Sequence, residues 1–98
     1  MFEIIQSDEF KLWHDGLRDN IARVRISARM RLATQGNLGD WKYLRESVSE
    51  MRINVGPGYR LYFTRRGNAV VVLLCGGDKR RQDTDLARAI ALAKLWKE

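Results

Sequence analysis

Two stretches with helical spacing of apolar residues fill the first third of the chain. The first repeats apolar residues at intervals of three and four, at Phe10, Trp13 and Leu17, and Ser7 or Asp8 can cap it. The second begins at a cap formed by Asp19 or Asn20 and runs to about Gln35. Because few residues separate the two stretches, they predict a helical hairpin.

The second predicted helix carries two apolar stripes. One stripe consists of Ile21, Val24, Ala28 and Leu32, and the other consists of Ala22, Ile26, Met30 and Ala33. A helix that is apolar on two sides is expected to be covered on two sides. Arginines fall between the stripes, and their extended stems can flank the contacts, at Arg23, Arg25, Arg29 and Arg31.

Over residues 40–75 the pattern changes from helical to alternating. Glycine-rich turns at hairpin spacing divide this region, which predicts consecutive antiparallel strands. A short strand is expected over residues 2–5. A final helix presents an apolar face made of Leu86, Ala89, Ile90, Ala93 and Trp96, and its cap can come from Asp78, Asp83 or Thr84. The predicted order is strand, two helices, strand meander and helix, an α+β fold in a single domain over residues 1–98.

The turn at Gly56-Pro57-Gly58 decides which side chains of the sheet face the core. Apolar residues alternate before it, at Met51, Ile53 and Val55, and after it, at Tyr59, Leu61 and Phe63. Pairing Val55 with Tyr59 across a three-residue turn puts both sets on one face. A two-residue turn would shift the pairing by one and send the second set to the opposite face. The sequence therefore favours the three-residue turn.

The opposite face of this hairpin then carries polar side chains, namely Arg52, Asn54, Arg60, Tyr62 and Thr64. Guanidinium groups suit phosphate, and aromatic rings can stack on bases. The next turn, at Gly67-Asn68, brings Arg60 beside Cys75, where the basic segment through Arg81 begins. We predict that the cations Arg52, Arg60, Lys79 and either Arg80 or Arg81 converge at one end of the sheet. A solvated sheet face with scattered charges would give the same pattern.

Composition favours an anionic partner and a cytoplasmic protein. Among the 98 residues, 18 Lys and Arg oppose 12 Asp and Glu, so the formal net charge is +6. No run approaches the roughly 20 apolar residues that span a bilayer, and the N-terminus lacks the pattern of a secretory signal. The lone Cys75 lies in an apolar run, which predicts a buried structural thiol.

No pattern indicates a metal or a cofactor. The sequence has no cluster of His, Cys and carboxylates with ligand spacing, no phosphate-binding P-loop and no Gly-x-Ser-x-Gly elbow. His14, the single histidine, is distant in sequence from the predicted cationic site. Trp13 and Trp96 are interpreted first as core or partner-contact residues.

Several segments together resemble the RelE/ParE toxin superfamily, and especially its HigB-like, phage-derived branch of addiction-module killer proteins. The order and spacing of these segments, which extend over nearly the whole chain, are more specific than any one of them. They are residues 10–13, the loop 36–40, Met51-Arg52-Ile53, the hairpin segment 56–63, and Gly76-Gly77-Asp78-Lys79 followed by Gln82, Asp83 and Asp85.

The resemblance implies a RelE-like fold, with two N-terminal helices packed on a curved antiparallel sheet and a C-terminal helix. It also implies the toxin of a type II toxin–antitoxin system, an mRNA interferase that cuts mRNA on the ribosome without a metal. A cognate antitoxin, often a helix-turn-helix protein in this branch, would neutralise it. Matching segments carry phosphate stabilisation onto Arg60 and a basic contact near the scissile phosphate onto Lys79, while Arg52 would add charge.

The chain departs from the family where an acid and a base are expected. Some relatives place a tyrosine in the last helix, or histidine and aspartate near the C-terminus, whereas this chain reads Gln82-Asp83-Thr84-Asp85-Leu86. Asp85 or Tyr62 would then act as acid or base. The predicted catalytic set is Arg60, Lys79, Arg52 and Asp85, and the predicted RNA contacts are Arg52, Asn54, Tyr62, Arg80 and Arg81.

Two other functions fit the same resemblance. A ParE-like protein would inhibit DNA gyrase without catalytic residues of its own. A catalytically inactive phage-derived protein would serve only as a binding partner. The sequence leaves these open beside the endoribonuclease.

Overall fold

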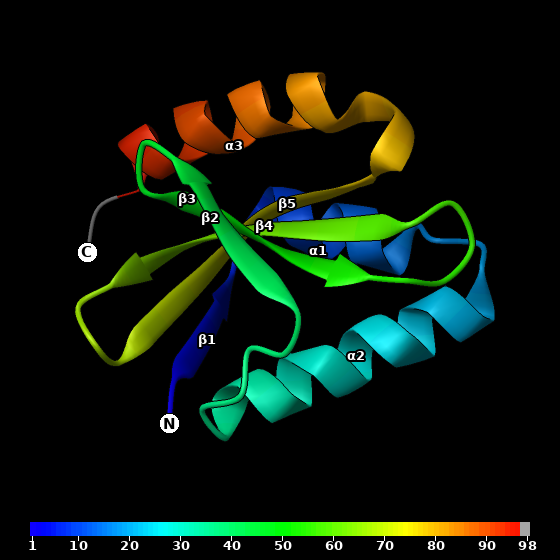
Figure 1. Cartoon of the computed structure of the whole chain (residues 1–98), viewed down its shortest axis with the longest axis horizontal. Coiled ribbons are helices and arrows are strands. Elements are labelled where there is room, and N and C mark those ends of the chain that lie inside the picture. Colours follow the sequence, from blue (N-terminus) through cyan, green and yellow to red (C-terminus); the bar gives the residue numbers. More distant parts are fainter. Residues whose placement is uncertain (97–98) are drawn as a thin grey trace.

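The computed structural model describes residues 1–96, which form one five-stranded sheet and three α-helices (Figure 1). The elements, in chain order, are β1 (Glu3–Gln6), α1 (Asp8–Asp15), α2 (Asn20–Thr34), β2 (Trp41–Arg45), β3 (Val48–Ile53), β4 (Tyr59–Arg66), β5 (Val70–Asp78), a short 3₁₀ turn η1 (Lys79–Arg81) and α3 (Gln82–Leu95). The predicted α+β class and element order are confirmed. None of the described helices is long and apolar enough to cross a membrane.

Both predicted caps of the helical hairpin are present. The Ser7 hydroxyl accepts a hydrogen bond from the backbone N–H of Phe10 at 3.0 Å, and it donates one to the carbonyl of Leu74 at 2.6 Å. The Asp19 carboxylate accepts from the backbone N–H of Ala22 at 3.1 Å. These side chains satisfy N–H groups that a helix leaves without partners in its first turn.

The sheet is mixed, which corrects the expectation of a wholly antiparallel one. Its strand order is β1-β5-β4-β3-β2, and β1 runs parallel to β5, with Glu3 opposite Val70 and Gln6 opposite Leu73. The meander from β2 to β5 is antiparallel, as predicted. A parallel partner for β1 requires a long connection, and the helices and the meander together provide it.

The proline-centred turn is longer than predicted. Ile53 pairs with Tyr59, so residues 54–58 form the loop, and Val55 lies outside the ladder. The shift amounts to two residues, and side chains alternate with a period of two. The predicted faces therefore survive, but the pairs are different: Met51 lies opposite Leu61, and Arg52 lies opposite Arg60.

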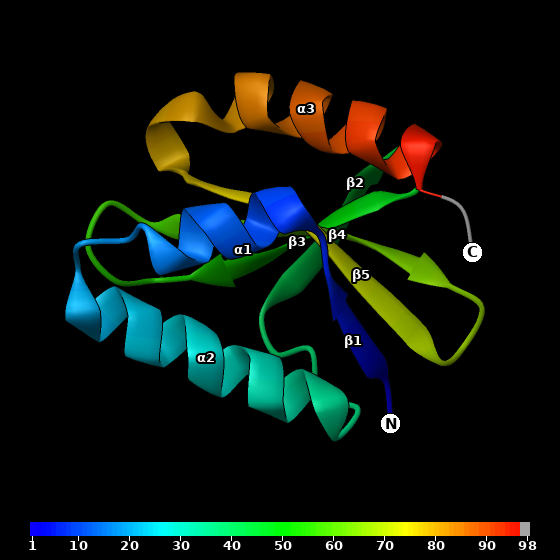
Figure 2. The ribbon, with the colours of Figure 1, turned by 180° about the vertical axis from the view of Figure 1, so that it is seen from behind.

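Helices cover both faces of the sheet, as two opposite views show (Figures 1 and 2). Helices α1 and α2 pack on one face, over a core that contains Phe10, Ile26, Leu61, Phe63 and Leu73. Helix α3 packs on the other face, over Val48, Tyr62, Val72, Leu74 and Ala89. The face that was predicted to carry polar groups toward a ligand is therefore largely an interior under α3.

Only one of the two apolar stripes of α2 is covered in the described chain. Ala22, Ile26 and Ala33 are buried against the sheet, as expected. Ile21 and Val24 on the opposite stripe are 64% and 67% exposed, and Leu32 is 40% exposed. The prediction that this helix is covered on two sides is thus wrong for the chain by itself.

Candidate functional site

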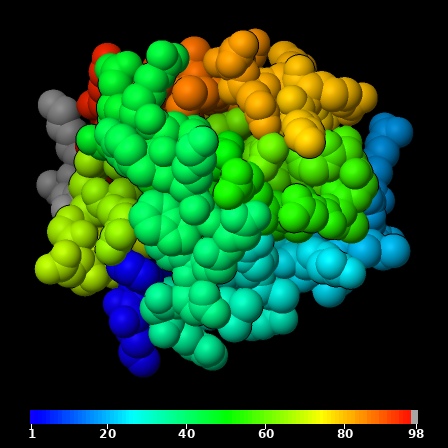
Figure 3. All heavy atoms as spheres, in the orientation of Figure 1, coloured from blue at the N-terminus to red at the C-terminus, as the bar shows by residue number. Residues whose placement is uncertain are grey.

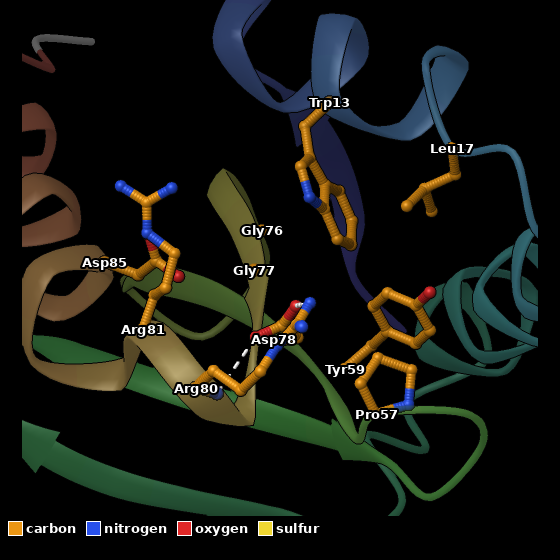
Figure 4. Close-up of a pocket in the computed structure, with 10 residues that line it drawn as sticks. All are labelled: Trp13, Leu17, Pro57, Tyr59, Gly76, Gly77, Asp78, Arg80, Arg81 and Asp85. Carbon is orange, nitrogen blue, oxygen red and sulfur yellow. Dashed lines mark hydrogen bonds and ion pairs between the residues drawn. The ribbon is translucent and has the colours of Figure 1, made fainter.

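A groove of about 330 Å³ opens at the end of the sheet, between α1, the β3–β4 loop and the start of α3 (Figure 4). We call it the glycine groove, because Gly76 and Gly77 lie at its centre. Its remaining lining residues are Trp13, Leu17, Pro57, Tyr59, Asp78, Arg80, Arg81 and Asp85.

The groove exists because β1 is shorter than its neighbour. Strand β1 pairs only with the first four residues of β5, from Val70 to Leu73. The chain then leaves the sheet at Ser7 and enters α1, so within residues 1–96 the second half of β5 has no strand on that side. Peptide groups at an unpaired strand edge can hydrogen-bond to a ligand.

Two glycines allow other elements to approach this strand closely. A Cβ atom at Gly76 would overlap the indole ring of Trp13, and a Cβ at Gly77 would overlap the carboxylate of Asp85. Trp13 and Asp85 therefore reach the strand from its two sides, where any larger residue would exclude them. The groove has an aromatic wall on one side of β5 and a charged wall on the other, as Figure 4 shows.

The aromatic wall consists of Trp13 and Tyr59. Their ring centroids are 6.2 Å apart in an edge-to-face arrangement, and both residues are partly buried. Trp13 also packs on Phe10, with centroids 5.7 Å apart. Neither aromatic was assigned to the site from the sequence, because a helical apolar spacing and a strand alternation both favour a core role. The sequence signal that accompanies them is the Gly-Gly pair.

The charged wall combines an ion pair with a carboxyl group of raised pKa. Asp78 accepts from the Nη2 of Arg80 at 2.8 Å and from its backbone N–H at 2.9 Å, and these bonds lower the pKa of Asp78. Burial raises the pKa of Asp85, while the positive charge of Arg81 opposes that shift. A carboxyl group that is costly to ionise beside a cleft is typical of functional sites.

Three successive cations, Lys79, Arg80 and Arg81, are exposed where β5 turns into α3. A second hollow of about 290 Å³ adjoins them at the first turn of α3. Arg81 stands at the N-cap position and makes no side-chain capping bond. Lys79 packs its stem against Gly58 of the β3–β4 loop. This end of the molecule thus presents positive charge together with the positive end of a helix dipole.

The sequence predicts that Arg60 contacts phosphate, but in the structure its guanidinium is buried against other side chains. It is 8% exposed, and its Nε lies 3.9 Å from Oε1 of Glu50. With the amide oxygen of Gln82 turned toward the guanidinium, that oxygen accepts from Nε at 3.0 Å and from Nη2 at 2.8 Å. Arg60 therefore ties the first turn of α3 to the sheet instead of facing the groove.

Arg52 lies opposite Arg60 in the ladder, but it is also engaged. Its Nη2 donates to Oδ1 of Asp40 at 2.8 Å, and about a third of its side chain is exposed. Asn54 is exposed in the loop that follows β3. The predicted cations thus gather at one end of the sheet in two groups: Arg52 and Arg60 in ion pairs on the sheet, and Lys79 to Arg81 beside the groove.

The prediction that Tyr62 contacts RNA is wrong for the described structure. Tyr62 is 1% exposed and belongs to the core under α3, so no base can stack on its ring. Burial, together with the charges of Glu50 and Asp85, raises the pKa of its phenol, which makes ionisation at neutral pH unfavourable. The period-two pattern placed Tyr62 on the correct face, but it gave no sign that α3 covers that face.

The same layer contains the single cysteine. Cys75 is 4% exposed, and burial raises its pKa to about 12, so it is a structural thiol, as predicted. Among residues 1–96, no three His, Cys, Asp or Glu side chains are grouped so as to hold a metal ion.

The glycine groove combines side chains and peptide groups of kinds that occur in sites for single-stranded nucleic acid. Aromatic rings offer stacking surfaces, and the cations of the second wall can neutralise phosphates. The open strand edge offers backbone donors and acceptors. Asp85 offers a carboxylate that can accept a proton. The arrangement thus brings together stacking, phosphate binding and a proton acceptor in one cleft.

Comparison with known proteins gives one informative match. No protein-family model matches the chain. A Haemophilus influenzae protein described as an uncharacterized protein is 40% identical to it over 85 residues, which is 87% of this chain and 86% of that protein. Since the identity extends over most of both chains, this chain belongs to the same protein family as that H. influenzae protein.

Proposed function

We propose that this protein is the toxin of a type II toxin–antitoxin system and acts as a ribosome-dependent, metal-independent mRNA endonuclease. The observation that carries the proposal is the glycine groove, where Trp13 and Tyr59 face Arg81 and Asp85 across a bare strand edge. The resemblance of the sequence to the HigB-like branch supports the same activity.

The reaction that suits this groove is attack by the ribose 2′-hydroxyl on the adjacent phosphorus. A base takes the 2′ proton, the 2′ oxygen–phosphorus bond forms, and the bond to the 5′ oxygen breaks. The leaving 5′ oxygen takes up a proton, so the products are a 2′,3′-cyclic phosphate and a 5′-hydroxyl. Asp85 is our proposed base, and Arg81 with Lys79 would stabilise the charge on the phosphorane.

This assignment changes the roles inferred from the sequence. Arg60, with both Glu50 and Gln82 as partners, serves as a positioning residue that holds α3 against the sheet. In this proposal the rings that stack on bases are those of Trp13 and Tyr59, and Tyr62 has no such role. The antitoxin of our proposal would be a separate protein, with the ribosome and its mRNA as the targets of the free toxin.

The test is induction of the protein in a tolerant host, followed by mapping of RNA 5′ ends with and without ongoing translation. We expect new 5′ ends within translated transcripts, and their loss when translation is blocked. Arg81→Ala and Asp85→Asn should each abolish most of the cleavage. The matched controls are Lys42→Ala and Asp83→Asn, which make the same charge changes at exposed positions outside the groove.

Other results would contradict the proposal in distinguishable ways. Intact transcripts during growth arrest, together with induction of the DNA-damage response, would favour gyrase inhibition. Overproduction without any effect on growth would favour an inactive binding protein. Cleavage that survives Arg81→Ala and Asp85→Asn would leave the nuclease in place but remove it from this groove.

A further inference from the structure

The exposed side of α2 carries an apolar stripe that no other part of the described chain covers. We call Ile21, Val24, Ala28 and Leu32 the outer stripe. Three of these side chains are 40–67% exposed, although the helix already buries its opposite side against the sheet. A shallow hollow of about 270 Å³, lined by Asn20, Ile21, Val24 and Arg25, lies on this stripe. Figure 3 shows α2, in cyan, at the surface of the molecule.

The charges that α2 itself places beside the outer stripe all have one sign. Helix α2 contains four arginines and no acidic residue. At 3.6 residues per turn, Arg25 and Arg31 project roughly 60° to either side of the stripe. Both are exposed, and within residues 1–96 neither makes an ion pair.

A neighbouring hollow extends this surface toward α1. It measures about 370 Å³ and is lined by Val24, Arg23, Ser27, Arg31, His14 and Asp15. The Ser27 hydroxyl of α2 lies 3.4 Å from Nε2 of His14 on α1. The outer stripe is therefore the apolar centre of a longer, mainly cationic surface.

From these observations we infer that the outer stripe is a docking surface for an acidic amphipathic helix of a partner protein. The stripe runs from Ile21 to Leu32, twelve residues that rise by about 17 Å along the helix, which matches about three turns of a partner. One apolar residue per turn suits packing of one helix against another. Carboxylates flanking the partner's apolar face would pair with Arg25 and Arg31.

The geometry disfavours other occupants. A second copy of this chain would set the same arginines against each other, with no carboxylate on either helix to compensate. Nucleic acid would find no aromatic ring on the stripe for stacking. Membrane-surface helices usually insert bulky aromatic or leucine faces, whereas this stripe is narrow and contains the small Ala28.

This inference does not depend on the proposed nuclease, because the outer stripe and the glycine groove share no residue. It can be tested with the intact protein and a labelled synthetic peptide of about 18 residues. The peptide carries leucines at helical spacing and glutamates on both sides of them. The control peptide has lysines in place of the glutamates. Binding is followed by fluorescence anisotropy, and folding of every variant is checked by circular dichroism.

We expect the acidic peptide to bind the wild type and the lysine peptide to bind at least tenfold more weakly. Val24→Asp should lower the affinity for the acidic peptide at least tenfold. Leu95→Asp, at an exposed apolar position on α3, should leave that affinity unchanged. The double variant Arg25→Glu/Arg31→Glu should reverse the preference and select the lysine peptide.

Several results would overturn the inference. These are equal binding of both peptides, an acidic-peptide affinity that Val24→Asp leaves unchanged, and a preference that survives the double charge reversal. Self-association of the wild type that Val24→Asp abolishes would assign the surface to a second copy. Binding to phosphatidylglycerol vesicles or to an RNA oligonucleotide that Val24→Asp alone removes would assign it to those ligands instead.

Discussion

Burial and a neighbouring cation act in opposite directions on the ionisation of Asp85 in the groove. Burial raises the pKa of its carboxyl group, so the protonated form is favoured more in the folded chain than in the unfolded one. The ionised carboxylate therefore lowers stability at neutral pH. That penalty disappears as the pH falls through the raised pKa, because the folded state then binds the proton more tightly.

Replacing Arg81 should raise the pKa of Asp85 further. The guanidinium of Arg81 favours the carboxylate, and Arg81→Ala removes that charge. Carboxyl carbon chemical shifts of Asp85, followed by NMR titration of the two proteins, measure the change directly. Lys42→Ala removes a distant cation and should leave the pKa of Asp85 unchanged. An unchanged or lower pKa in Arg81→Ala would show that Arg81 does not act on Asp85.

Arg60 should be a stability residue. Arg60→Ala leaves Glu50 without its cation at a buried position and also removes the donor to Gln82. We expect a loss of about 3 kcal/mol in the free energy of unfolding, typical of a buried pair with one partner removed.

Urea unfolding measures this loss, and adding Glu50→Gln to Arg60→Ala should recover part of it. Arg45→Ala, at an exposed position in β2, should change stability by less than about 0.5 kcal/mol. A stable Arg60→Ala protein would mean that the guanidinium contributes little to holding α3.

At the scale of elements, α1 depends on its cap as much as on its apolar face. Ser7→Ala removes both the bond from the backbone of Phe10 and the bond to the carbonyl of Leu74, and Ser7 is 6% exposed. We expect a loss of about 2 kcal/mol in unfolding free energy. Thermal and urea unfolding test this value. The control Thr84→Ala lies on the exposed side of α3 and should stay within about 0.5 kcal/mol of the wild type.

The sequence predicted where the helices and strands lie better than it predicted how the strands pair. Caps and apolar spacing located the helices, because both are local signals carried by residues such as Ser7 and Asp19. The alternation also assigned strand faces correctly. The parallel pairing of β1 was missed, since its partner lies 67 residues away and no local pattern records that contact. The turn length was missed because two alignments that differ by two residues bury the same side chains.

The candidate site was predicted in part, for similar reasons. The basic segment after β5 was visible in the sequence, and it borders the groove. The covering of Tyr62 by α3 was not visible, because an amphipathic helix does not reveal which face of a sheet it will cover. The role of Trp13 was missed because the close approach to Gly76 is a tertiary contact.

At the scale of the whole molecule, the excess of positive charge predicts how RNA binding depends on salt. Affinity for a single-stranded oligonucleotide should fall linearly on a plot of log K against log salt concentration. Arg81→Ala should reduce the slope by about 0.7, the value for one phosphate contact on a single strand. Lys42→Ala should keep the wild-type slope. An equal reduction in both variants would indicate diffuse attraction to the net charge of +6 with no preferred groove.

The position of β1 also bears on how the chain is made. Strand β1 is synthesised before its partner β5, with helices α1 and α2 and three strands between them, so β1 cannot pair until β5 has emerged from the ribosome. Closing so long a loop is entropically costly and slow compared with forming the hairpins of the meander. Docking of β1 is therefore expected late in folding. Docking of β1 also allows the Ser7 hydroxyl to bond to the carbonyl of Leu74 and brings Trp13 onto Gly76. The aromatic wall would therefore be the last part of the groove to form.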